Sequence, residues 1–103
     1  MDKIEILKTL KSFQPIFKQE EINLLGLFGS YARDEATKDS DIDILIETTP
    51  AFLTKYRGWD AIVKLDELKD ILKQSLGKEI DIVDKQGLLQ HNNHYILDKT
   101  IYV

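Results

Sequence analysis

The chain has 103 residues, the length of one domain, because a second domain at this total length could not bury its own core. Its 18 acidic and 14 basic residues leave a net charge of −4 without a block of Lys or Arg, so direct nucleic-acid binding is not expected. No cysteine is present, which excludes disulfides, thiolate metal sites and a cysteine nucleophile. The charged beginning and the lack of a long apolar stretch predict a soluble cytoplasmic protein, one domain over residues 1–103, with no membrane contact.

The first predicted element is a helix that begins after Asp2, a residue type that caps helix N-termini. Apolar residues then recur at helical spacing and define one stripe: Ile4, Leu7, Leu10 and Phe13. Pro15 is predicted to end this helix or to begin a separate last turn, because proline cannot donate the backbone hydrogen bond of a helix interior. We interpret the helix as a scaffold that covers a sheet.

Two strands are predicted on either side of a short helix. The mostly apolar run at 22–28 suits a buried strand, and residues 41–47 alternate between acidic and apolar side chains at their start, as a strand does. Between these strands, residues 31–36 favour a short helix and residues 37–40 favour a loop.

A longer helix dominates the second half of the sequence. Pro50 can open a helical segment that residues 57–58 interrupt, and Asp60 is predicted to cap the next helix. That helix has a broad apolar face made of Ile62, Val63, Leu65, Leu68, Ile71, Leu72 and Leu76. Gly77 stands where a C-terminal cap belongs, and residues 78–84 return to the alternation of a third strand.

The tail at 85–103 has a weaker periodicity. Two apolar groups, at 88–89 and 95–97, are candidates for a final helix and an extended end. The element order predicts an α/β (α+β) domain with a small mixed sheet of three or more strands flanked by helices.

The strand at 41–47 gives the first indication of chemistry. Because side chains alternate between the two faces of a strand, Asp41 and Asp43 point away from the isoleucines beside them. Asp81 alternates with isoleucines in the same way and shares the face of Asp41 and Asp43 if all these isoleucines share one core. Three converging carboxylates repel one another unless cations neutralise them, and oxygen ligands suit Mg²⁺ or Mn²⁺. Alone, an Asp-x-Asp pair is also typical of a solvent-facing strand.

The Gly29-Ser30 pair predicts a complementary anion site. Glycine lets the backbone approach a ligand closely, and Ser30 at a helix N-terminus offers its hydroxyl beside free backbone N–H donors. Phosphate is the anion that fits best. Next to metal-binding carboxylates, the pair predicts a metal–nucleotide site, although Gly-Ser alone is also typical of an ordinary strand-to-helix turn.

The run GSYARDEATKDSDIDILIE resembles the signature of the minimal nucleotidyltransferase family, within the DNA polymerase beta-like superfamily. The family pattern is Gly-Ser, a spacer of about ten residues, Asp-x-Asp and a third Asp on a later strand. The residues that match it are Gly29, Ser30, Asp41, Asp43 and, in the place of the third carboxylate, Asp81. One departure is Asp34, where members often have Gly after the Ala-Arg pair. The resemblance covers nearly the whole chain and implies the polymerase beta-like nucleotidyltransferase fold.

The resemblance also implies a mechanism. A nucleoside triphosphate, expected to be ATP, would place its terminal phosphates on Gly29 and Ser30. Two Mg²⁺ ions, or Mn²⁺ in their place, would be held by the three carboxylates. Asp81 would help to activate an acceptor hydroxyl, whose attack on the α-phosphate transfers AMP and releases pyrophosphate. Lys38 or Arg33 is a candidate to neutralise the leaving group.

Family members of this size are often encoded beside a HEPN-domain protein as a toxin–antitoxin pair. The resemblance therefore implies that the acceptor is a tyrosine hydroxyl of a HEPN toxin and that this chain acts as the antitoxin. Two other functions stay open. One is a stoichiometric antitoxin that covers its partner without catalysis. The other is a nucleotidyltransferase for small molecules, which would need a homo-oligomer to form the acceptor pocket.

The remaining polar and aromatic residues are interpreted as structural. His91 and His94 are three residues apart, but with no cysteine and no acidic residue at ligand spacing, metal binding by them is not expected. Trp59 and Tyr31 are interpreted as packing residues, although Tyr31 is close enough to the predicted site to contact a base. Asp84 is assigned to a solvated end of the third strand and Glu79 to a flanking face, and a solvated helix face is formed by Asp66, Glu67 and Asp70.

Overall fold

The computed structural model describes residues 1–90 and 94–103, so His91 lies outside the described residues. The elements in chain order are α1 (Lys3–Gln19), β1 (Ile22–Phe28), α2 (Gly29–Ala32), β2 (Ile42–Thr48), α3 (Pro50–Lys55), α4 (Trp59–Leu76), β3 (Ile80–Asp84), α5 (Lys85–Gln90), α6 (Tyr95–Asp98) and β4 (Ile101–Tyr102). This order confirms the predicted α/β class. No helix among the described residues is long and apolar enough to cross a membrane.

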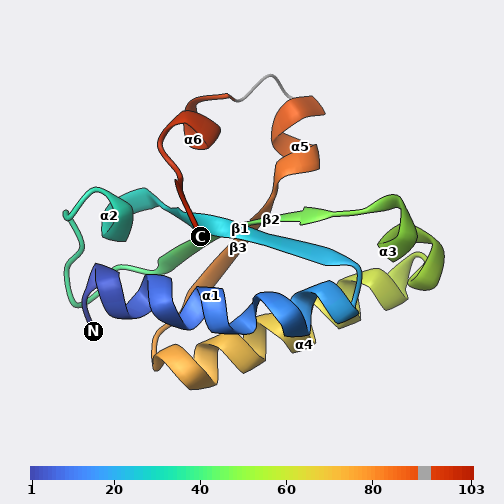
Figure 1. The fold of residues 1–103 in the computed structure, drawn as a ribbon, viewed down its shortest axis with the longest axis horizontal. Helices are drawn as coiled ribbons and strands as arrows, with labels where there is room; N and C mark the ends of the chain where they lie inside the picture. The colour runs from blue at the N-terminus through green and yellow to red at the C-terminus, as the bar shows by residue number, and fades with distance from the viewer. Residues whose placement is uncertain (91–93) are drawn as a thin grey trace.

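The strands form one mixed sheet in the order β3-β2-β1-β4. β1 is antiparallel to both β2 and β4, whereas β2 and β3 are parallel. A parallel pair needs a crossover connection, which α3 and α4 supply here. Figure 1 shows α1 and α4 together on one face of the sheet and α5 and α6 on the other. A mixed sheet flanked by helices is the architecture that the sequence predicts.

The sheet face under α1 and α4 carries the main apolar core. Alternation along β2 points its three isoleucines into this core, and all three side chains are 0% exposed: Ile42, Ile44 and Ile46. The opposite face has a smaller apolar cluster, built from buried Phe28, Leu45 and Leu88 with partly buried side chains around them. The two faces therefore differ in how much of their area is apolar and dry.

Helix α1 continues through Pro15, so the prediction that it ends there is wrong. Its start is as predicted, since the Asp2 carboxylate accepts a hydrogen bond from the Glu5 N–H at 2.9 Å. Pro15 removes one backbone hydrogen bond of the helix interior. Phe17, two residues further on, is 0% exposed and anchors the last turn in the main core. Burial of this ring holds the helix together to Gln19.

Helix α4 begins after Gly58, and the prediction that Asp60 caps it is wrong. Asp60 lies in the first turn, where a negative charge still interacts favourably with the helix dipole. The predicted C-terminal cap is confirmed. Gly77 has φ +68°, and its N–H donates to the Lys73 carbonyl at 2.8 Å.

The apolar face of α4 is covered only in part, although Ala61 and Leu65 in its first half also pack against the main core. The buried residues of this face are Leu68, Leu72 and Leu76. Ile62, Val63 and Ile71 are exposed, and Trp59, which the sequence suggests to be a packing residue, is 73% exposed. The pattern identifies the apolar face of α4 correctly, but the sheet is too narrow to cover all of it.

The other boundaries shift by a few residues. The short helix predicted at 31–36 is α2, which ends sooner because Asp34 has φ +59°, a left-handed conformation outside the helical region. β2 and β3 begin at Ile42 and Ile80, later than predicted. The tail forms two short helices, α5 and α6, and its extended end is β4.

Candidate active site

Asp43 and Asp81 lie side by side on the two parallel strands. The register pairs Asp43 of β2 with Asp81 of β3, and paired residues of neighbouring strands point to the same face of a sheet. That face is opposite the main core, because Ile42 and Ile44 on either side of Asp43 are buried there. Asp41 directly precedes β2 and is exposed. The fold thus brings the three predicted carboxylates together where β2 and β3 begin, and we name this group, Asp41, Asp43 and Asp81, the carboxylate edge.

The three carboxylates are close enough for their charges to interact. Partial burial raises the pKa of Asp43, and the negative charges of Asp81 and Asp41 raise it further. The Arg33 guanidinium acts in the opposite direction, lowering the pKa of Asp43. A cation at this place would relieve the repulsion among the carboxylates.

Gly29 is the point where β1 and α2 meet the carboxylates. β1 ends at Phe28, which pairs with Asp43 of β2, so the next residue lies beside the Asp43 side chain. Gly29 has φ +74°, and a Cβ atom there would collide with the Asp43 carboxylate. Glycine is therefore required twice, for its backbone conformation and for its lack of a side chain.

Ser30 follows Gly29 as the second residue of α2 and is half-buried. Because α2 has only 4 residues, its dipole is small, and any phosphate contact here depends on local N–H groups and the Ser30 hydroxyl. The assignment of Gly29 and Ser30 to phosphate binding stays a prediction, and the structure shows that Gly29 lies next to the Asp43 carboxylate.

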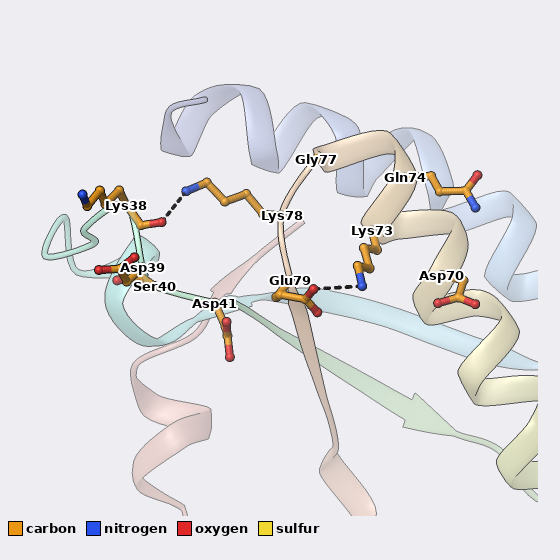
Figure 2. Close-up of a pocket in the computed structure, with 10 residues that line it drawn as sticks. All are labelled: Lys38, Asp39, Ser40, Asp41, Asp70, Lys73, Gln74, Gly77, Lys78 and Glu79. Atoms are coloured by element: carbon orange, nitrogen blue, oxygen red, sulfur yellow. Dashed lines mark hydrogen bonds and ion pairs between the residues drawn. The ribbon is translucent and has the colours of Figure 1, made fainter.

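A polar cavity of about 760 Å³ opens beside Asp41 (Figure 2). The loop before β2 forms one wall, and the end of α4 with the turn to β3 forms the other. Two interactions cross or line it: Lys78 donates to the Lys38 carbonyl at 3.0 Å, and Lys73 pairs with Glu79 at 2.8 Å (Figure 2). The ion pair raises the pKa of Lys73 and lowers that of Glu79, mainly through their hydrogen bond. Glu79 is thus a flanking residue, as interpreted from the sequence.

The structure separates the two candidates for the leaving group. Arg33 lies close enough to Asp43 to change its pKa, and its Nε atom is 3.1 Å from a Glu35 carboxylate oxygen. Lys38 lines the polar cavity instead. Sequence spacing alone offered both residues, because it could not show which way the 33–40 segment folds. Arg33 is the better placed of the two.

Asp84 differs from its sequence interpretation. The sequence predicts a solvated end of the strand here, but the Asp84 carboxylate accepts hydrogen bonds from the Thr48 N–H at 3.2 Å and from the Thr48 hydroxyl. Asp84 therefore ties the end of β3 to the end of β2. It stabilises the strand pair that carries Asp43 and Asp81, because Thr48 follows Asp43 by five residues along β2 and Asp84 follows Asp81 by three along β3.

The donor set suits a hard divalent cation. All three carboxylates supply oxygen ligands, the type that Mg²⁺ and Mn²⁺ prefer. Among the described residues, however, no group of three or more His, Cys, Asp or Glu side chains is arranged to hold a metal ion. Asp41 and Asp81 are exposed, so rotation of their side chains toward Asp43 is sterically open. The residues fit a metal by chemistry and position, and the metal stays a prediction.

Comparisons with known proteins identify the class of protein to which this fold belongs. A family model described as the nucleotidyltransferase domain matches residues 4–103. A solved structure of a candidate minimal nucleotidyltransferase superposes with a TM-score of 0.77, covering 100% of this chain and 97% of the other at 26% identity.

Two sequence relatives agree. A candidate protein adenylyltransferase of Methanocaldococcus jannaschii is 38% identical over 95 residues, which cover 89% of this chain and 84% of the relative. The protein adenylyltransferase MntA of Thermococcus cleftensis is 34% identical over 79 residues, covering 77% and 72%. The chain therefore belongs to the nucleotidyltransferase domain family and is an enzyme of this kind, as its sequence motif indicated.

Proposed function

We propose that this chain is a protein adenylyltransferase that transfers AMP from ATP to a hydroxyl group of a partner protein. The observation that carries the proposal is the pairing of Asp43 with Asp81, with Gly29 pressed against Asp43. Support for a protein acceptor comes from the relatives, two of which carry the name protein adenylyltransferase in their descriptions.

Each residue of the edge has a role in this proposal. Gly29 and Ser30 bind the terminal phosphates through backbone N–H groups and a hydroxyl. Arg33 balances negative charge next to Asp43, where the phosphates must pass. Asp41, Asp43 and Asp81 are the residues that would hold Mg²⁺, which supplies positive charge to the phosphoryl oxygens and favours ionisation of the acceptor hydroxyl.

The proposed step is an in-line displacement at the α-phosphorus of ATP. A bond forms between the acceptor oxygen and the α-phosphorus, and the bond to the bridging oxygen of the β-phosphate breaks, releasing pyrophosphate. The acceptor proton passes to Asp81, the exposed carboxylate on the outer strand of the sheet, and from there to solvent.

We further propose that the acceptor is a tyrosine of a HEPN-domain toxin and that modification makes this chain an antitoxin. The support is the family resemblance of the sequence motif together with the open geometry of the site. Asp41 and Asp81 are both exposed, which leaves the site open to an acceptor on a second molecule. An exposed pair of carboxylates suits a protein acceptor better than an enclosed small molecule.

An intact-mass assay tests the proposal. The wild-type chain, a purified HEPN-domain partner, Mg²⁺ and ATP are expected to give an AMP-sized mass increase on the partner. Asp43→Asn should abolish the increase. Asp39→Asn is the matched control, because Asp39 is an exposed carboxylate on the loop before β2 and lines the polar cavity.

Three outcomes separate the candidate functions. Loss of the mass increase in Asp43→Asn but not in Asp39→Asn supports adenylyl transfer. Neutralisation of the toxin by a complex in which even the wild type produces no mass increase would favour the stoichiometric antitoxin. Transfer of AMP to a small hydroxyl compound, without transfer to the partner, would favour the small-molecule enzyme.

A further inference from the structure

The first half of α4 exposes a stripe of large apolar side chains. Trp59 is 73% exposed, Ile62 54% and Val63 42%. Positions 59, 62, 63 and 66 are neighbours on one side of a helix, so these side chains form one continuous surface. Large adjacent apolar groups on a surface mark an interaction site more often than isolated ones do.

This stripe lines a groove of about 390 Å³ between α4 and β3, which we name the α4–β3 groove. The groove extends from Trp59 to Lys69, roughly 15 Å along the helix axis at 1.5 Å per residue. On the sheet side it is lined by Asp81 and Ile82 of β3, an outer strand with one unpaired edge. An outer strand beside an apolar stripe gives a partner both backbone and side-chain contacts.

The groove is continuous with the candidate active site through Asp81. The same carboxylate that pairs with Asp43 in the sheet also lines the groove. The chain reverses direction at Gly77, between the end of α4 and the start of β3. Asp81 is the second residue of β3, so it lies nearer the Lys69 end of the groove than the Trp59 end. A chain bound along the groove would therefore pass beside Asp81.

The charge of the groove selects the chemistry of its occupant. Three carboxylates line it, those of Asp66, Glu67 and Asp81, against one ammonium group, that of Lys69. Glu67 is partly balanced by Lys64 at 3.0 Å. An apolar floor with an acidic rim is complementary to a segment that carries apolar side chains flanked by Lys or Arg.

We propose that the α4–β3 groove docks the acceptor protein through a basic-flanked apolar segment and so delivers the acceptor hydroxyl to Asp81. This inference rests on the proposed function, because it names the surface by which that enzyme recognises its substrate. The apolar contact supplies affinity and the acidic rim supplies selectivity.

A second copy of this chain is a less suitable occupant. Its basic apolar surface lies on α1, where Ile4, Leu7, Lys8 and Lys11 line another groove. Contact between α1 of one copy and α4 of the next would join two different surfaces. Such head-to-tail contacts close only in rings and otherwise continue into filaments.

The single tryptophan of the chain gives a direct readout, because Trp59 lies in the groove. Two synthetic peptides serve as probes, each with one tyrosine between leucines, one flanked by lysines and its twin by glutamates. Excited where tyrosine does not absorb, Trp59 should show a blue-shifted emission that saturates with the lysine peptide and not with the glutamate peptide. With Mg²⁺ and ATP, the lysine peptide should also be the better AMP acceptor.

Matched variants locate the binding surface. Ile62→Ser should weaken binding of the lysine peptide about tenfold, and Asp66→Lys should remove the preference for lysine over glutamate. Ile4→Ser is the control, since Ile4 is 62% exposed on α1 and lies outside the groove. Both test variants keep Trp59 and change exposed residues, so folding is expected to be unaffected.

Several results would overturn the inference. They are an unchanged Trp59 emission with the lysine peptide, equal binding of both peptides, and equal effects of Ile62→Ser and Ile4→Ser. Loss of self-association in Ile62→Ser, measured by sedimentation, with peptide binding unchanged would assign the groove to a second copy instead. A normal Trp59 response without AMP transfer to any acceptor would overturn the proposed function and not the binding surface.

Discussion

The two faces of strand β2 have opposite properties within one residue of each other. Ile44 is 0% exposed in a core that α1 and α4 cover, whereas Asp43 next to it belongs to a charged edge opposite that core. The dry face supplies most of the buried apolar area. The other face keeps three carboxylates near one another, which is electrostatically unfavourable without a ligand. Because side chains alternate along β2, one face of this strand contributes to the apolar core and the other carries the carboxylates.

The largest effect is expected for Asp43→Asn, which should slow AMP transfer by about 10³-fold or more. The amide keeps the shape of the side chain but loses the charge that binds a cation. Because it also removes a repulsion with Asp41 and Asp81, the melting temperature without Mg²⁺ should not fall. Transfer rates and thermal unfolding measured on the same preparation check both statements. Transfer within tenfold of wild type would contradict the role of Asp43.

Ile44→Ala should have the opposite profile and lower the free energy of unfolding by about 2–5 kcal/mol. The reason is the cavity left in the main core, where Ile44 is fully buried. Leu45→Ala is the matched comparison, since Leu45 is equally buried but belongs to the smaller cluster with Phe28 and Leu88. Leu45→Ala should lower the free energy of unfolding by an amount near the low end of this range, because the side chains of a small cluster can move to fill the cavity. Denaturant unfolding would measure both, and equal losses would contradict the difference between the faces.

Gly29→Ala should lower both the stability of the fold and the rate of AMP transfer. A left-handed φ costs a non-glycine residue about 1–2 kcal/mol, and the new Cβ would also displace the Asp43 carboxylate. Gly77→Ala isolates the first term, because Gly77 has φ +68° with nothing within 4 Å of an added Cβ. Both variants should lose stability, but only Gly29→Ala should lose AMP transfer. Normal transfer by Gly29→Ala would show that the close approach to Asp43 is dispensable.

The smallest effect is expected for the hydrogen bond between Tyr56 and Glu20, whose contribution to stability should depend on pH. The hydrogen bond from the Tyr56 hydroxyl, helped by Lys64 and Lys55, holds the pKa of Glu20 below its ordinary value of 4.5. A lowered carboxyl pKa stabilises the fold above the ordinary value, and this stabilisation disappears as the pH falls through the lowered one. Tyr56→Phe should therefore lower the free energy of unfolding by about 1 kcal/mol at neutral pH and by less at acidic pH.

Tyr95→Phe is the control for this last prediction, because Tyr95 is 64% exposed on α6. It should leave unfolding unchanged at every pH. A constant difference between wild type and Tyr56→Phe across the acidic range would mean that Tyr56 acts through packing against Phe52, whose ring is 5.2 Å from its own.

The sequence predicted the relative positions of Asp43 and Asp81 better than it predicted the residues around them. Alternation along two strands was enough to place Asp43 and Asp81 on one face, because the period of a strand is two whatever its neighbours are. It could not show that Gly29 contacts Asp43, since that contact depends on the register of β1 against β2. Nor could it orient Arg33, which depends on where α2 ends.

Two further differences have a common physical cause. Periodicity identified the apolar face of α4 but not the extent of the sheet that covers it, so the exposure of Ile62 was not foreseen. Likewise, the proline rule applies to local hydrogen bonds, and the burial of Phe17 overrides it in α1. Local patterns describe what an element can bury, and only the tertiary structure determines what is buried.

Asp34, the one departure from the family motif, is accommodated by its backbone conformation and by an ion pair. The family resemblance predicts Gly at this position, and the φ of +59° at Asp34 agrees with that expectation, since glycine adopts the left-handed region without strain. Aspartate tolerates this region better than most residues. Its carboxylate pairs with Lys3 of α1 at 2.9 Å, so its negative charge is compensated locally.

The register between Asp43 and Asp81 also determines which changes in chain length the enzyme can accept. The exposed loop at 37–39 can gain or lose a residue without changing which face the strand residues occupy. One residue inserted between Ile80 and Asp81 would turn the carboxylate into the main core and Ile80 away from it, or force a bulge. Homologues should therefore vary in length before β2 and keep a fixed number of residues within β3, so that the Asp81 carboxylate stays on the same face of the sheet as Asp43.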